Sequence, residues 1–309
     1  MKKTFKLFLK KHPLKAYVVI AYGITWFCWI TALIVSDKLG YILPVQDVFT
    51  KFIQSGFTDI YNILTSLIFM LGGFGPLIAA LIVIWFESGS KGIAKLSGQI
   101  FRFRIGLHWY LKAVVIAVAI ASVPFLLIVL TPLANFNIRD INILIPFIIP
   151  VLLWEIINSF GEEPGWRGFL LPRLQKRFDD ERYIWLLGLI WAVWHYPYVV
   201  YHTVLSVGNM PVMGIVMITV FSLAGYTLSL IGQTYIYVWF YNNTKSVFLA
   251  VFFHGILNVI TLIVATSMGG FNPTISLVMA LMPWAVVIAL TKIIGREKFP
   301  GHIHTTSSV

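Results

Sequence analysis

SVFLAVFFHGILNVITLIVATS occupies residues 246–267 and contains no Lys, Arg, Asp or Glu. About 20 consecutive apolar residues are enough for a helix to cross the hydrocarbon core of a bilayer. A helix satisfies all its backbone hydrogen bonds internally, so lipid can surround it. This stretch therefore predicts a transmembrane helix, and it places two polar side chains, His254 and Asn258, within the membrane.

The whole chain has the composition of a membrane protein. Of its 309 residues, 59% are hydrophobic and 11% are charged, and the mean hydropathy is +0.86. A soluble domain is about 25% charged. The net charge of +11 would suit a nucleic-acid partner, but surplus Lys and Arg in membrane proteins gather in cytoplasmic loops. We therefore expect membrane lipids, and no nucleic acid, as partners.

Other uncharged stretches predict seven further spans. The eight expected spans are about 16–35, 62–85, 113–133, 141–160, 183–201, 211–231, 246–267 and 274–290. The glycines and the proline at 72–76 predict a kink or close packing in the second span. A single helix over the uncharged stretch 203–244 would be roughly 60 Å long, about twice a bilayer core. We therefore expect the aromatic residues after 231 to form a separate interfacial segment, and the basic and apolar residues of 87–109 to form an amphipathic surface helix.

The positions of the basic residues test this number of spans. With eight spans, every Lys and Arg falls on one side except Lys38, Lys51 and Arg139. This asymmetry predicts that both termini lie in the cytoplasm. The expected fold is an all-α, polytopic transmembrane helical bundle that forms a single integral domain over 1–309 in the cell membrane.

Residues 161–168, GEEPGWRG, place ionisable groups at the end of the fourth span. The adjacent carboxylates of Glu162 and Glu163 repel each other, which favours proton uptake by one of them and suits it to general base catalysis. Arg167 lies one helical turn after Glu163 and can pair with it. Glu163 and Arg167 then hold each other and leave Glu162 for chemistry. The alternative is a solvated loop of mixed charge outside the lipid.

Two histidines and an asparagine lie inside later spans, where ionisable groups are rare and commonly functional. His195 is about 12 residues into the fifth span, and Trp191 precedes it by one turn on the same face. His254 and Asn258 share a face of the seventh span because they are four residues apart. Each of these residues also has an ordinary explanation as a hydrogen-bonded packing residue. Together with Glu162 they can converge from three helices at a similar depth.

Such a group can activate water. Glu162, directly or with His195, takes a proton from a water molecule that attacks a peptide carbonyl, and His254 and Asn258 donate hydrogen bonds to the oxyanion. A second version places Zn²⁺ on His195 and His254, with a Glu as base or ligand. The chain has no HExxH pair on one helix, so the zinc ligands would come from separate helices. Both versions, and therefore the cofactor, stay open.

These motifs resemble those of the CPBP family of intramembrane proteases, which includes CAAX prenyl endopeptidases and bacterial bacteriocin-processing and immunity proteins of the ABI type. The family's three motifs are EExxxR, which matches Glu162, Glu163 and Arg167, FxxxH, which matches Trp191 to His195, and HxxxN, which matches His254 and Asn258. Trp191 replaces the family's Phe, and we expect this change to alter packing around His195 more than chemistry.

The resemblance implies a catalytic core over 141–267 and a helical fold with an intramembrane cavity open to the cytoplasm. It implies that Glu162 and His195 are the acid–base pair and that His254 and Asn258 support the oxyanion.

Three functional hypotheses follow. The first is an intramembrane endopeptidase that cuts a membrane-associated peptide or lipidated protein, such as a prenylated CAAX-type or bacteriocin-like substrate. The second is a non-catalytic immunity or scaffold protein that binds a peptide or protein partner in the same cavity. A transporter is the third, and the absence of an internal repeat weighs against it. Glu155, two turns before Glu162, is expected to line the cavity or to pair with a polar neighbour.

Overall fold

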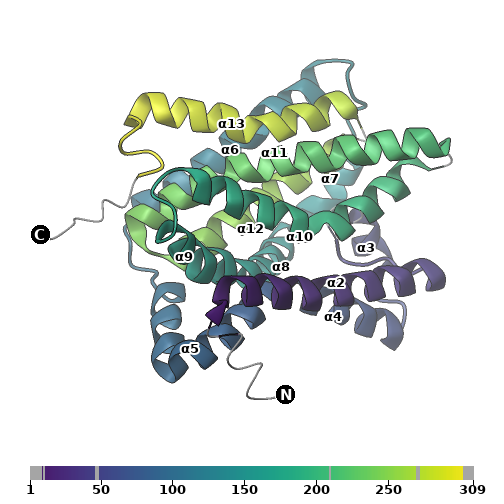
Figure 1. Cartoon of the computed structure of the whole chain (residues 1–309). Helices are drawn as coiled ribbons and strands as arrows, with labels where there is room; N and C mark the ends of the chain where they lie inside the picture. Colours follow the sequence, from purple (N-terminus) through teal and green to yellow (C-terminus); the bar gives the residue numbers. More distant parts are fainter. Residues whose placement is uncertain (1–8, 10, 46–48, 209, 269–271, 302–309) are drawn as a thin grey trace, which may run out of the picture.

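Eight helices in the described part of the chain are long and apolar enough to cross a membrane. The computed structural model describes residues 9, 11–45, 49–208, 210–268 and 272–301, and these residues contain no strand (Figure 1). The chain is therefore an all-helical, multi-pass membrane protein, which confirms the fold class and the number of spans. The glycines at 269 and 270, expected to separate the last two spans, lie outside the described residues.

The helices follow one another with short connections. In chain order they are α2 (Pro13–Leu39), α3 (Phe49–Ser55), α4 (Ile60–Gly73), α5 (Gly75–Ile100), α6 (Leu107–Leu130), α7 (Ile138–Leu144), the 3-10 turn η2 (Ile145–Phe147), α8 (Ile148–Glu163), the π-helical segment η3 (Pro164–Leu170), α9 (Leu171–Gln175), α10 (Arg182–Val207), α11 (Val212–Thr244), α12 (Val247–Ser267) and α13 (Pro273–Ile294).

The second expected span is broken where the sequence predicts a kink. Helix α4 ends at Gly73 and α5 begins at Gly75, with Phe74 between them. A side chain at Gly75 would collide with Thr25 on α2, so glycine allows the two helices to approach closely. Gly89, with φ 58° and ψ −146°, interrupts α5 again. The helix after it ends at Ile100, so the expected amphipathic helix over 87–109 is shorter than predicted.

Helix α11 differs from the prediction. It runs without interruption for 33 residues, from Val212 to Thr244, and no separate interfacial segment follows residue 231. Its last third is buried in protein, since Ile236, Tyr237 and Phe240 are each 0% exposed. The helix exceeds a bilayer core, at roughly 50 Å, because packing against α10 and α13 covers it where lipid would not.

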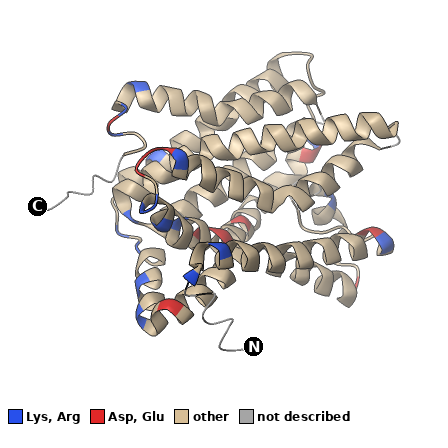
Figure 2. Cartoon of the chain, in the orientation of Figure 1, with Lys and Arg blue, Asp and Glu red and all other residues tan. Residues whose placement is uncertain are grey.

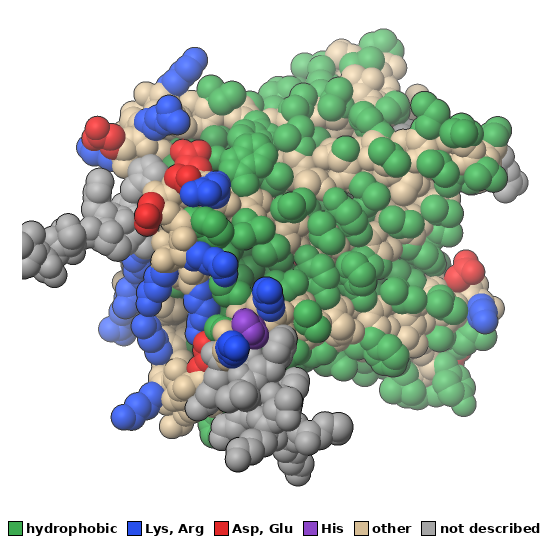
Figure 3. Space-filling view, in the orientation of Figure 1, with side chains coloured by type: hydrophobic (Ala, Val, Ile, Leu, Met, Phe, Trp, Pro, Cys, Tyr) green, Lys and Arg blue, Asp and Glu red, His purple; other side chains and the backbone are tan. Residues whose placement is uncertain are grey.

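Charge divides the bundle into two ends. Figures 2 and 3 show Lys and Arg gathered at the end where α2 begins and α13 ends, with an apolar surface over the rest of the bundle. We call this the basic end. Lys38, Lys51 and Arg139 lie at the opposite end, on α2, α3 and α7. The distribution agrees with the charge asymmetry in the sequence, and the exposed apolar belt is the surface expected to contact lipid.

The helices that carry the three motifs form the centre of the bundle. Helix α8 packs against α12, and α10 packs against α11. Close approach depends on glycine at three positions. A Cβ on Gly161 would lie 2.8 Å from the Gly73 carbonyl oxygen, and one on Gly255 would lie 2.8 Å from the Ile156 side chain. One on Gly165 would lie 2.5 Å from the Pro76 carbonyl oxygen. Gly161 and Gly165 thus form a small-xxx-small face that seats the Glu-bearing helix against the α4–α5 junction.

Candidate active site

Glu162 and Glu163 lie in the last turn of α8, and Arg167 lies in η3, without an intervening loop. Pro164 has no N–H group to continue the α-helical hydrogen bonds, and the chain passes through a π-helical segment before α9. Such segments occur frequently at functional sites. Glu163 and Arg167 are each 0% exposed and Glu162 is 8% exposed. The alternative of a solvated loop is therefore wrong.

Glu163 is the anchor of a buried ionic network. Its Oε1 accepts hydrogen bonds from Arg167 Nη1 at 2.8 Å and from His254 Nδ1 at 2.9 Å. The Arg167 guanidinium also lies over two rings, 4.1 Å from the Trp191 centroid and 3.8 Å from the Tyr237 centroid. Desolvated cation–π contacts contribute about 2 kcal/mol. The Glu163–Arg167 pair thus lies as the spacing predicts, with His254 as a third member.

This network determines what His254 can offer. Because Nδ1–H is donated to Glu163, Nε2 carries a proton only when the ring is an imidazolium, a form that the neighbouring carboxylate stabilises. In that form His254 is a charged hydrogen-bond donor, which suits the stabilisation of an oxyanion.

Glu162 is held by two indoles instead of by a cation. Trp191 Nε1 donates to Glu162 Oε2 at 2.9 Å, and Trp166 Nε1 donates to the same oxygen at 3.3 Å. Trp166 lies one turn after Glu162 on the same segment, while Trp191 reaches it from α10. Both rings are at most 1% exposed, so the carboxylate has a fixed, dry support on one side.

His195 faces Glu162 from α10. Its Nδ1 lies 2.9 Å from the Trp191 carbonyl oxygen, which can only accept, so Nδ1 must carry the proton of a neutral ring. Nε2 is then the unprotonated nitrogen, and it lies 4.0 Å from Glu162 Oε2. That separation exceeds a direct hydrogen bond. Trp194 packs against the ring in a T-shaped contact with centroids 4.5 Å apart, which fixes its orientation.

Asn258 is positioned by Glu155. Asn258 Nδ2 donates to Glu155 Oε2 at 2.9 Å, across the α8–α12 interface. Glu155 is 6% exposed and lines the same cavity as Glu162. Both alternatives predicted for Glu155 hold, because it lines the cavity and also pairs with a polar neighbour. It fixes the orientation of an amide that lies one turn from His254.

The motif residues border one cavity of about 1050 Å³. Glu162, His195, His254 and Asn258 line it, together with Glu155. Glu163 and Arg167 lie behind this wall and do not line it. The convergence from three helices that the sequence predicts is therefore present, and the two halves of the EE doublet face different surroundings.

The side chains present do not match a zinc site. Among the residues that the structure describes, no three or more His, Cys, Asp or Glu side chains gather in a group that could hold a metal ion. The Glu162 oxygen nearest His195 already accepts two indole N–H groups. The zinc version with His195 and His254 as ligands therefore enters no step of the mechanism below.

Several features of the site were missed in the sequence. The contact between Trp166 and Glu162 could have been predicted from the sequence. The two residues are four positions apart, the same spacing that joins Glu163 to Arg167. No sequence pattern indicated Tyr237, since its contact with Arg167 arises only from the burial of α11. The Trp191 indole also does more than fill the place of a Phe ring, because its N–H group bonds the Glu162 carboxylate.

Comparisons with known proteins find similarity over the segment that carries the three motifs. Residues 144–260 match the family described as Type II CAAX prenyl endopeptidase Rce1-like. CAAX prenyl protease 2 of Methanococcus maripaludis is 30% identical over 111 residues, which are 36% of this chain and 39% of that protein. The chain thus spans well under half the length of this relative. Residues 144–260 carry all three motifs, and over this segment the chain is similar to the CAAX prenyl endopeptidases.

Proposed function

We propose that this protein is an intramembrane endopeptidase that hydrolyses a peptide bond of a membrane-associated substrate, with residues 141–267 as its catalytic core. The observation that carries the proposal is that Glu162, His195, His254 and Asn258 line one cavity. The family match over the same segment supports the reaction class.

In this mechanism Glu162 and His195 share one water molecule. Two atoms 4.0 Å apart can each lie about 2.8 Å from a single water oxygen. Glu162 takes a proton as the water oxygen bonds to the carbonyl carbon of the substrate. The neutral Nε2 of His195 accepts a hydrogen bond from the same water and orients its lone pair. Since the Glu162 carboxylate is already held by indoles, little reorganisation accompanies the step.

The negative charge that develops on the carbonyl oxygen is stabilised from α12. His254, as an imidazolium supported by Glu163, and Asn258, held by Glu155, are the donors. Preorganised donors in a dry site contribute about 3–4 kcal/mol each to such a transition state. The C–N bond then breaks, and Glu162 returns its proton to the departing amine. The products are a carboxylic acid and an amine, which exchange a proton to give a carboxylate and an ammonium ion, and Glu162 is again ionised.

The substrate class is proposed at the level of a membrane-associated peptide. The matched relative is named for prenylated CAAX proteins. For this chain, a prenylated CAAX-type tail and a bacteriocin-like peptide are the two members of the class to be compared.

Glu162→Gln in the purified full-length protein tests the function. Quenched peptides, lipidated and plain, are assayed with wild type, with this variant, and with Glu297→Gln, a matched change at an exposed position beyond α13. We expect wild type and Glu297→Gln to cleave with equal rates, unaffected by a zinc chelator, and Glu162→Gln to be inactive. Equal cleavage by Glu162→Gln would show that Glu162 is not the base. Peptide binding without cleavage by any variant would instead support the immunity or scaffold hypothesis.

A further inference from the structure

Tyr237 on α11 contacts all three motifs, although α11 carries no motif residue. Its ring centroid lies 3.8 Å from the Arg167 guanidinium carbon. It also makes T-shaped contacts with the Trp191 ring, with centroids 5.5 Å apart, and with the His254 ring, with centroids 6.1 Å apart. These three residues come from the EExxxR, FxxxH and HxxxN motifs, in that order. Tyr237 is therefore placed to act on both the base and the oxyanion donor of the proposed site.

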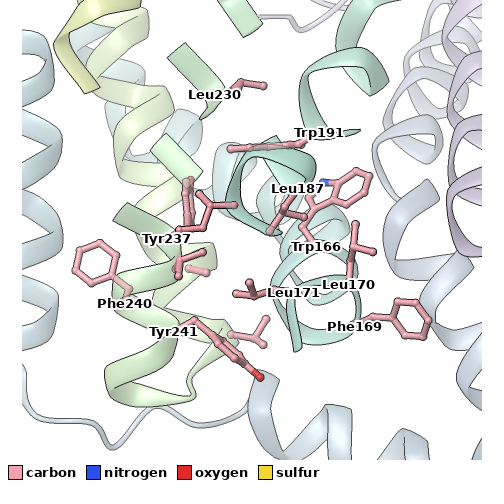
Figure 4. Close-up of a cluster of buried hydrophobic side chains, with 14 of the residues drawn as sticks. Trp166, Phe169, Leu170, Leu171, Leu187, Trp191, Leu230, Tyr237, Phe240 and Tyr241 are labelled. Atoms are coloured by element: carbon pink, nitrogen blue, oxygen red, sulfur yellow. The ribbon is translucent and has the colours of Figure 1, made fainter. Parts of the chain in front are cut away.

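The ring of Tyr237 is itself held in place by the core. It is 0% exposed and packs against Phe253 on α12, with centroids 4.9 Å apart. Figure 4 shows it inside a cluster of buried side chains, together with Trp191. Helix α11 is seated against α10 at Gly188, where a Cβ would lie 2.8 Å from the Ile231 Cα atom. This close approach lies less than two turns before Tyr237, so a tightly packed helix pair presents the ring.

Tyr237 limits the positions that are open to Arg167. The Arg167 guanidinium carbon lies 4.1 Å from the Trp191 centroid and 3.8 Å from the Tyr237 centroid, and the two rings are nearly perpendicular. The guanidinium thus occupies the corner that the two rings form. Arginine stacks well on aromatic faces because it is planar and weakly hydrated. Since Arg167 and His254 bond the same Glu163 oxygen, a shift of Arg167 would move the oxyanion donor as well.

Tyr237 also orients the Trp191 indole. Their rings lie at 88° to each other, in the edge-to-face arrangement that aromatic pairs prefer. The same indole donates its N–H group to Glu162 Oε2 at 2.9 Å. A rotation of the indole would move this N–H group away from the carboxylate, so Tyr237 supports the base indirectly. Tyr237 is not among the residues that line the cavity, and any effect on catalysis therefore passes through its neighbours.

We propose that Tyr237 is a positioning residue, which holds the oxyanion donor His254 and the base Glu162 in their reactive places through its neighbours. Its effect on kcat rests on the proposed endopeptidase function, whereas its effect on the position of His254 does not. The aromatic ring, and not the hydroxyl group, performs this role. Within the described part of the chain the hydroxyl makes no hydrogen bond, and the faces of Phe and Tyr rings both attract a cation.

Substitutions at Tyr237 and at a control position on the same helix test this role. Phe240 is also 0% exposed and packs against the same Phe253 ring, with centroids 5.2 Å apart. Its other ring contacts are with Trp109 and Trp239, away from the site. Tyr237→Leu, Tyr237→Phe and Phe240→Leu are compared in the purified full-length protein, with kcat and KM measured separately and melting temperature as the measure of folding. Tyr237→Met, whose flexible side chain fills irregular space, replaces Tyr237→Leu if the latter does not fold.

We expect Tyr237→Leu to lower kcat by roughly 10- to 30-fold with little change in KM, since it removes a desolvated cation–π contact. Tyr237→Phe should keep the kcat of wild type, and Phe240→Leu should lower the melting temperature without lowering kcat. Two results would overturn the proposal. One is an equal kcat for Tyr237→Leu and Phe240→Leu, which would make Tyr237 a packing residue only. The other is a loss in Tyr237→Phe as large as that in Tyr237→Leu, because the hydroxyl group would then be responsible.

The position of His254 is measured without any substrate. In protein labelled with the heavy nitrogen isotope in histidine, NMR spectra distinguish a protonated ring nitrogen from an unprotonated one, and His254→Gln identifies the signals of this residue. We expect a protonated Nδ1 in wild type, Tyr237→Phe and Phe240→Leu, because Glu163 accepts its hydrogen bond, and loss of this fixed state in Tyr237→Leu. An unchanged His254 in Tyr237→Leu would overturn the proposal. If no variant, wild type included, cleaves a peptide while His254 changes as expected, the endopeptidase function fails and the positioning of His254 by Tyr237 stands.

Discussion

Trp191→Phe removes one hydrogen bond from the proposed catalytic base and keeps an aromatic ring in its place. The indole N–H lies 2.9 Å from Glu162 Oε2, and the ring is 1% exposed. A hydrogen bond to a charged group contributes about 1.5–3 kcal/mol. If the bond holds the carboxylate in its reactive position, its loss lowers kcat by roughly 10- to 150-fold, since about 1.4 kcal/mol corresponds to tenfold. Trp166→Phe removes the longer, 3.3 Å bond, and we expect a smaller loss of activity.

The assay is the initial rate of peptide cleavage over a range of substrate concentrations, which separates kcat from KM. Trp185→Phe is the matched control, because it also deletes an indole hydrogen bond, to the Tyr235 hydroxyl, on the same helix but away from Glu162. Melting temperature and elution volume confirm that each variant is folded. If folded Trp191→Phe keeps the kcat of wild type, the indole does not position the carboxylate. That result would favour the expectation that a Trp in place of Phe alters packing around His195 more than chemistry.

Substitutions at three further positions test the supports around the site, and a fourth position serves as a control. Glu163→Gln leaves a buried guanidinium without its carboxylate and should destabilise the protein by about 3–5 kcal/mol; an unchanged melting temperature would contradict this. Glu155→Gln keeps an acceptor for Asn258 and should retain most of kcat, whereas Glu155→Leu should lower kcat at similar KM; equal activity of the two would exclude a positioning role. Gly165→Ala places a methyl group 2.5 Å from a backbone oxygen and should cost about 1–3 kcal/mol. Gly98→Ala, with nothing within 4 Å, should be neutral or stabilising by melting temperature.

The spans could be predicted because the thickness of the bilayer core sets the number of uncharged residues in a membrane-spanning helix. Helices α2, α12 and α13 begin and end within a few residues of the predicted bounds. The same rule failed for α11, since it assumes that lipid surrounds the whole helix. The last third of α11 is buried in protein instead, where Tyr237 and Phe240 contact Phe253 on α12, so its aromatic residues fill the core and not the interface. Burial of a helix by other helices is a property of the tertiary structure, so the length of such a helix cannot be predicted from the length of an uncharged stretch.

The site was predictable to the extent that helical periodicity determines it. The four-residue spacing of Glu163 and Arg167 and of His254 and Asn258 places each pair on one face. Contacts between helices were not predictable in this way. Asn258 bonds Glu155, 103 residues away, and its role as an oxyanion donor was assigned without this partner. The only sequence feature that could have indicated this partner was the position of Glu155, two helical turns before Glu162.

The geometry also explains why the motif needs two adjacent carboxylates. Neighbouring residues on a helix point about 100° apart, so Glu162 and Glu163 cannot face the same space. Glu163 faces the core, where Arg167 and His254 both hydrogen-bond to its Oε1 and hold it in place. Glu162 faces the cavity and is held only by neutral indoles, which fix its position without neutralising its charge. In the proposed mechanism, one turn of helix thus supplies both the anchor for His254, the oxyanion donor, and Glu162, the base for water. Exchanging their roles by mutation would require rotating α8 against the glycine contacts that seat it.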